Sequence, residues 1–143
     1  MASPTAYRKP LPTIDVWNKP FWDACREHRF IAQKDNRSAH VWFPPGPVCP
    51  TNRSSDWRWV DLSGRGTVWS WVAFHQKYYD GFESEMPYNV ATVELDEGPR
   101  IMTNIVNTTN DKIHIGMRVG VTFHDVDDGL AIPLFQPLAE GGR

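Results

Sequence analysis

Few residues of this sequence are of the types that do covalent or metal chemistry. Their spacing favours neither a nucleophilic site nor a metal site. The two cysteines, Cys25 and Cys49, lack the adjacent histidine and base that a thiolate nucleophile needs. Cys25 falls on the apolar stripe of an expected helix, so we interpret it as a small core residue. The histidines show no metal-ligand spacing, such as i, i+4 on a helix: His28, His40, His75, His114 and His124. We therefore predict no catalytic residue in this chain.

An aromatic group is a better candidate for binding. Tyr78, Tyr79 and Phe82 lie on an expected long connection just before Pro87. Aromatic side chains on a loop are poorly explained by a barrel core and are typical of a contact surface. We expect this loop to contact an acyl-CoA or a partner protein; the alternative is a loop that folds over the mouth of the barrel.

Composition narrows the class of protein. The chain has 143 residues, 41% hydrophobic, and a net charge of -2, which suits one domain with a short appendage. It has no lysine–arginine cluster, so nucleic acid is not the expected partner. No apolar run approaches the ~18 residues of a membrane span, and no signal peptide opens the chain, so we expect a cytoplasmic protein. The seven tryptophans indicate either a partner surface or a tryptophan-rich core.

The element pattern is mainly β. Residues 1–12 are polar and proline-rich, which predicts a flexible arm, and one or two short helices are expected over 14–28. Within them Phe21, Ala24 and Cys25 fall at i, i+3, i+4 and form an apolar stripe. Expected strands follow at 30–34, 40–43, 57–60, 67–79, 88–95, 100–106, 118–125 and 130–136, before a flexible tail at 138–143. This pattern alone predicts a small barrel or sandwich.

A specific order of landmarks goes further than the pattern. The chain carries Pro20-Phe21-Trp22, Phe43-Pro44-Pro45, Val48-Cys49-Pro50, then Ser63-Gly64-Arg65-Gly66-Thr67-Val68 and Val93 to Arg100. In this order it resembles, over about residues 16–137, the domain of unknown function 35 family, zinc-ribbon OB-fold proteins associated with acyl-CoA enzymes. The resemblance implies a helical segment (13–29), a rubredoxin-like zinc-ribbon arm (30–56) and a C-terminal OB-fold barrel (57–137).

The ribbon departs from the family pattern at the metal ligands. Family members carry two Cys-x-x-Cys knuckles, and here these positions hold Asp35 and Ser38 in the first and Cys49 and Asn52 in the second. A structural zinc site needs four ligands, mostly thiolate or imidazole. We expect no zinc and no other cofactor. We hypothesise that aromatic packing holds the arm instead, through Trp42, Phe43, Trp57 and Trp59.

The resemblance also implies a role. It predicts a non-catalytic accessory subunit of a thiolase-superfamily enzyme, a thiolase, retro-aldolase or acyltransferase, that acts on carbon–carbon bonds of a CoA ester, with steroid side-chain or aromatic-acid metabolism as candidate settings. The expected assembly is a hetero-oligomer with a thiolase-fold subunit. Aromatic anchors are the candidate interface: Trp17, Phe21, Trp22, Trp42 and Phe43. The alternative is a stand-alone OB-fold module that binds acyl-CoA or single-stranded nucleic acid.

Overall fold

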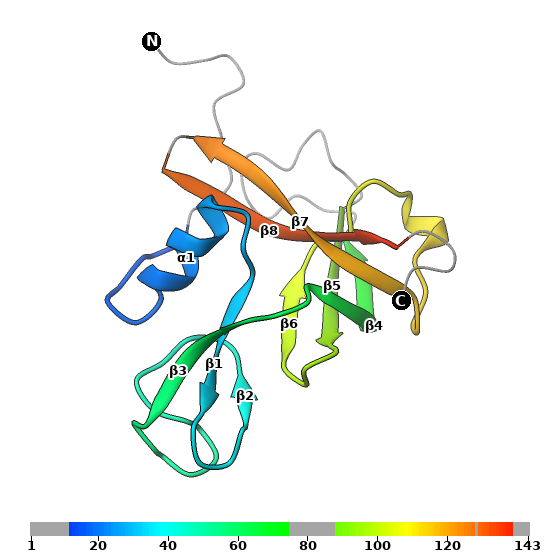
Figure 1. The fold of residues 1–143 in the computed structure, drawn as a ribbon. Coiled ribbons are helices and arrows are strands. Elements are labelled where there is room, and N and C mark those ends of the chain that lie inside the picture. Colours follow the sequence, from blue (N-terminus) through cyan, green and yellow to red (C-terminus); the bar gives the residue numbers. More distant parts are fainter. Residues whose placement is uncertain (1–11, 75–87, 128, 139–143) are drawn as a thin grey trace.

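The computed structural model describes residues 12–74, 88–127 and 129–138, which form two sheets and one α-helix (Figure 1). One sheet has three strands in the order β2-β1-β3, and the other has five in the order β6-β5-β4-β7-β8. The elements in chain order are α1 (Lys19–Arg26), β1 (Ile31–Asp35), β2 (Val41–Trp42), β3 (Trp57–Asp61), β4 (Arg65–Phe74), β5 (Tyr88–Leu95), β6 (Arg100–Thr103), the 3₁₀ turn η2 (Asn110–Lys112), β7 (Arg118–Asp127) and β8 (Leu130–Pro137).

The five-stranded sheet curls into a nearly closed, OB-like barrel, which confirms the predicted fold class. Its two edges approach each other through a parallel bridge between Ile105 and Phe135. The backbone N–H of Val106 donates to the carbonyl of Phe135 at 2.8 Å. A bulge between Val68 and Ser70 interrupts the β4–β5 register. Such bulges increase the bend of a strand, which a small barrel requires.

Helix α1 lies against β8 and covers one part of the core (Figure 1). The stripe predicted from sequence is buried: Phe21, Ala24 and Cys25 are 1%, 5% and 0% exposed. Behind it, the ring of Phe30 meets that of Phe135 edge-on, with centroids 5.9 Å apart. The helix is therefore part of the barrel's hydrophobic core. Among the described residues, no helix has the length and apolar character to cross a membrane.

The three-stranded sheet forms an arm that extends away from the barrel (Figure 1). Strand β3 pairs with β1 along its whole length, from Ile31 opposite Asp61 to Asp35 opposite Trp57. From the sequence, this strand is expected to open the barrel segment 57–137, whereas the structure pairs it with β1 in the three-stranded sheet. A half-buried strand such as β3 can pair in either sheet, and only the long-range pairing shows which sheet it joins.

Two local features hold the arm's connections in place. The buried Gln33 side chain donates to the carbonyl of Gly46 at 2.7 Å and accepts from its N–H at 2.8 Å, which ties the proline-rich connector to β1. At the exit to the barrel, Gly64 has a φ of +76°, and a Cβ there would collide with Val121. Only glycine satisfies both conditions. The proline-rich connector and the segment around Gly64 therefore both hold the arm in position.

Candidate functional site

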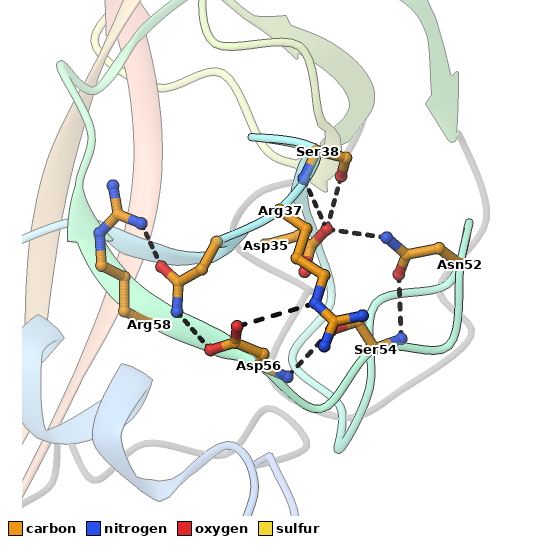
Figure 2. Close-up of polar contacts among 8 residues, drawn as sticks. Asp35, Arg37, Ser38, Asn52, Ser54, Asp56 and Arg58 are labelled. Atoms are coloured by element: carbon orange, nitrogen blue, oxygen red, sulfur yellow. Dashed lines mark hydrogen bonds and ion pairs between the residues drawn. The ribbon is translucent and has the colours of Figure 1, made fainter.

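The four knuckle positions lie together at the tip of the arm, and Asp35 is their centre. Asp35 ends β1 and is 0% exposed. Its Oδ2 accepts hydrogen bonds from the Ser38 N–H at 2.9 Å, the Ser38 hydroxyl at 2.6 Å and the Asn52 side-chain amide at 2.8 Å (Figure 2). The Ser38 and Asn52 bonds hold the pKa of the Asp35 carboxyl well below its usual range. We call Asp35, Ser38, Cys49 and Asn52 the knuckle quartet.

The second knuckle is an ordinary hydrogen-bonded turn. The N–H of Arg53 donates to the carbonyl of Cys49 at 2.8 Å, and the Asn52 side-chain oxygen accepts from the Ser54 N–H at 2.9 Å. The Cys49 thiol is buried and lies 3.2 Å from the Thr51 hydroxyl. Burial opposes its ionisation, but hydrogen bonds from Thr51 and Asn52 outweigh that effect and lower the pKa of the thiol. Local hydrogen bonds therefore hold the Cys49 thiol in its position.

The knuckle quartet does not fit the zinc ion that the family fold implies. It offers one thiol, one hydroxyl, one amide and one carboxylate, whereas structural zinc takes four ligands dominated by thiolate and imidazole. Three hydrogen bonds already converge on Asp35 Oδ2. Across the part of the chain that the structure describes, no three His, Cys, Asp or Glu side chains are placed to hold a metal.

A row of aromatic rings runs beside the quartet. Trp42 and Trp57 meet edge-on at 6.2 Å, as do Trp57 and Trp59 at 5.7 Å, and the ring of His40 stacks on Trp42 at 6.5 Å. The Trp57 indole N–H also donates to the carbonyl of Pro47 at 2.9 Å. Trp42, Trp57 and Trp59 therefore contact one another, whereas Phe43 meets Phe21, with ring centroids 5.3 Å apart. That aromatic packing replaces the metal stays a hypothesis, and the Asp35 network shares the tip of the arm with these rings. That network was not predicted from the sequence.

A cleft of about 380 Å³ separates the arm from the barrel. Its arm side consists of Ala39, His40, Val41, Trp42, Phe43 and Pro50, and its barrel side of Glu97, Gly98 and Pro99 in the β5–β6 turn. Glu97 Oε2 accepts from the Ser63 N–H at 2.8 Å. Its other oxygen, Oε1, is enclosed and has no hydrogen-bond partner among the described residues. Sequence reasoning missed Glu97, because a turn glutamate resembles any solvated charge.

The predicted interface residues occupy different environments. Phe21 and Trp42 are 1% and 6% exposed, so they pack inside this chain and not on its surface. Trp22 and Phe43 are half-buried against the core, whereas Trp17 is 43% exposed. Their role as an interface stays a prediction, now centred on Trp17. The predicted loop of Tyr78, Tyr79 and Phe82 lies outside the described residues.

Comparison with known proteins decides the family. Residues 59–124 match the family model described as ChsH2, C-terminal OB-fold domain. A DUF35 domain-containing scaffold protein of Pyrococcus furiosus is 31% identical over 117 residues, 78% of this chain and 85% of the relative. The chain belongs to the DUF35 family. The Asp35 network and the cleft are therefore features of a member of the DUF35 family.

Two further similarities are to an aldolase and to an enoyl-CoA hydratase subunit. A chain of the solved Ltp2-ChsH2(DUF35) aldolase is 38% identical, with a TM-score of 0.80 over 89% of this chain and 98% of that one. A probable enoyl-CoA hydratase alpha subunit of Thermomonospora curvata is 40% identical over 129 residues, 90% of this chain. The chain spans 40% of that relative's length.

Proposed function

We propose that this chain is a non-catalytic accessory subunit of a thiolase-fold enzyme that makes or breaks a carbon–carbon bond in a CoA ester. The similarity to almost the whole of the DUF35 chain in the Ltp2-ChsH2(DUF35) aldolase is the observation that carries the proposal. The name of that protein pairs a DUF35 chain with a second component and an aldolase activity. The CoA ester would be the substrate of the complex.

The described side chains support a role without covalent chemistry. Burial raises the pKa of the Cys25 thiol to about 12, so it stays protonated and inert. The Cys49 thiol is enclosed at the knuckle. The His28 ring pairs with Asp125 at 2.9 Å and stacks on Phe123. No nucleophile–base pair forms among these groups, so the reacting side chains are expected in the partner.

The turn before α1 is a candidate surface for that partner. Ile14, Val16 and Trp17 are 48%, 74% and 43% exposed. The Asp15 carboxylate accepts from the N–H groups of Trp17 and Asn18, both at 2.8 Å. A turn held in this way orders its apolar side chains before binding, which lowers the entropic cost of association. Exposed tryptophans on rigid backbone are frequent interface hot spots.

Affinity purification of the tagged chain from its source cells tests the proposal, followed by native mass measurement and an acyl-CoA cleavage assay. We expect a thiolase-fold protein at equal stoichiometry, with activity in the complex and none in the isolated chain. Trp17→Ala should weaken co-purification, whereas Met102→Ala, 73% exposed on β6, serves as the matched control. Recovery of the chain alone, together with saturable acyl-CoA binding by calorimetry, would favour the stand-alone module instead.

A further inference from the structure

We propose that the Asp35 carboxylate does for this arm what zinc does in a metal-bearing ribbon: it joins the two knuckle turns to each other. The first knuckle turn is residues 35–40 and the second is residues 49–54. A structural zinc ion binds ligands from two such knuckles and thereby holds them together. The knuckle quartet does not fit zinc, so another link has to hold these turns. This role is independent of the proposed function, because it concerns the isolated chain.

Each knuckle turn is closed by its own backbone hydrogen bonds. In the first turn the Asp35 N–H donates to the His40 carbonyl at 2.8 Å, and the Ala39 N–H donates to the Asp35 carbonyl at 2.9 Å. In the second turn the Arg53 N–H donates to the Cys49 carbonyl at 2.8 Å. Both partners of each bond lie in the same turn. These backbone bonds therefore shape the turns but do not join one turn to the other.

One carboxylate oxygen, Asp35 Oδ2, accepts donors from both turns (Figure 2). Ser38 donates from the first turn through its N–H and its hydroxyl, and Asn52 donates from the second turn through its side-chain amide at 2.8 Å. The Asn52 amide is itself oriented, because its oxygen accepts the Ser54 N–H at 2.9 Å. Asp35 also ends β1 and pairs with Trp57 of β3. The link between the turns is therefore anchored on the three-stranded sheet.

The charge of Asp35 makes this link strong. A buried carboxylate is costly unless hydrogen bonds compensate it, and bonds to a charged acceptor are about twice as strong as neutral ones. Asp35 is 0% exposed, and its Oδ1 has no hydrogen-bond partner among the described residues. The donors on Oδ2 therefore supply the compensation. The bonds from Ser38 and Asn52 lower the pKa of the Asp35 carboxyl, so the group is ionised near neutral pH.

The aromatic row holds a different part of the arm. Trp42 of β2 meets Trp57 of β3, and Trp57 meets Trp59 of the same strand. The Trp57 indole N–H reaches the connector at the carbonyl of Pro47. The bond from Asn52 to Asp35, in contrast, starts within the second knuckle turn. Replacing a ring and replacing the carboxylate should thus affect different backbone amides.

Hydrogen exchange followed by NMR tests the proposal on the isolated full chain in EDTA. The probes are the N–H groups of Ala39 in the first turn and Arg53 in the second, and the Val106 N–H in the barrel is the internal reference. Asp35→Asn keeps an oxygen acceptor but removes the charge. We expect it to lower protection at both probes by about tenfold or more, since hydrogen bonds to charged groups have that magnitude. Asp56→Asn is the matched control, because Asp56 is an exposed carboxylate of the same arm, and it should leave protection at Arg53 unchanged.

Asn52→Ala keeps the test decisive if Asp35→Asn does not fold, because Asn52 is exposed. It should lower the protection of Ala39 in the other turn by about tenfold, and by less in the Asp35→Asn background, since both changes weaken the same bond. The proposal is overturned if Asn52→Ala affects only its own turn, or if Asp35→Asn changes neither probe. A loss of protection caused by EDTA in the unmodified chain would also overturn it, because a metal would then hold the turns. If Trp57→Ala lowers protection at Arg53 and Asp35→Asn does not, the aromatic row is the link instead.

Discussion

Replacing Phe21 by alanine separates the structural role of α1 from its role as an interface. The Phe21 ring is 1% exposed and meets three other rings edge-on: Trp22 at 5.1 Å, Phe43 at 5.3 Å and Phe30 at 5.9 Å. These contacts join the helix, the start of β1 and the connector after β2. Removing a buried phenylalanine typically costs about 3–5 kcal/mol, and edge-on pairs add roughly 0.5–1.5 kcal/mol each to area burial. We expect Phe21→Ala to lower the free energy of unfolding by about 3–5 kcal/mol.

Urea unfolding followed by tryptophan fluorescence, with thermal melting by circular dichroism, measures this loss. At roughly 2–4 °C per kcal/mol for a chain near this length, the melting temperature should fall by about 6–20 °C. Trp17→Ala is the control, because this side chain is 43% exposed and its loss should change stability by about 0.5 kcal/mol or less. A loss below about 1 kcal/mol in Phe21→Ala would refute the reasoning, since it would mean that the ring is not packed as described. The affinity for the partner should respond differently from stability. Trp17→Ala should weaken partner binding, and the conservative Phe21→Leu, in folded protein, should retain it.

The remaining predictions concern the knuckle quartet and one ion pair. Purified chain should contain no stoichiometric zinc by elemental analysis, and EDTA should not change its melting temperature. The triple variant Asp35→Cys, Ser38→Cys, Asn52→Cys should bind zinc stoichiometrically and become chelator-sensitive, because the knuckle quartet would then offer four thiolates. Stoichiometric, EDTA-removable zinc in the native chain would contradict this. The hydrogen bond from Arg118 lowers the pKa of Asp96. The ion pair of Asp96 with Arg118 therefore contributes fully to stability above the ordinary carboxyl pKa of 3.8, and this contribution is lost as the pH falls below that value. Denaturant titrations from pH 7 to pH 3 should therefore show a shallower acid-side loss of stability in Asp96→Asn, and identical pH profiles in the two proteins would disprove the coupling.

Local sequence patterns were sufficient for several elements. The i, i+3, i+4 stripe of Phe21, Ala24 and Cys25 identified the buried face of α1, because helical periodicity places these residues on one side whatever lies opposite. The turn after Leu95 was equally readable from its residues, since acidic and glycine residues favour the backbone angles of a hairpin. The sequence predicted one or two helices over residues 14–28, and the structure has a single α-helix beginning at Lys19.

Strand partnership could not be read from local pattern. Strand β3 has the alternation of any half-buried strand, and that alternation is compatible with either the arm or the barrel. The pairing with β1 joins Ala32 to Val60, residues separated by a long proline-rich connector. Which strand lies beside which is set by the total burial and hydrogen bonding of the folded chain, so the partner of β3 is known only from the structure.

The sequence by itself determined that three of the four knuckle ligands are absent, because ligand chemistry is a property of residue type and Asp35, Ser38 and Asn52 are not thiolates. Only the tertiary structure decided what occupies that place. The bond from Asn52 to Asp35 joins two separate turns, and Glu97 lines the same cleft as residues of the arm. Such contacts depend on how distant segments converge, and no local pattern encodes that convergence.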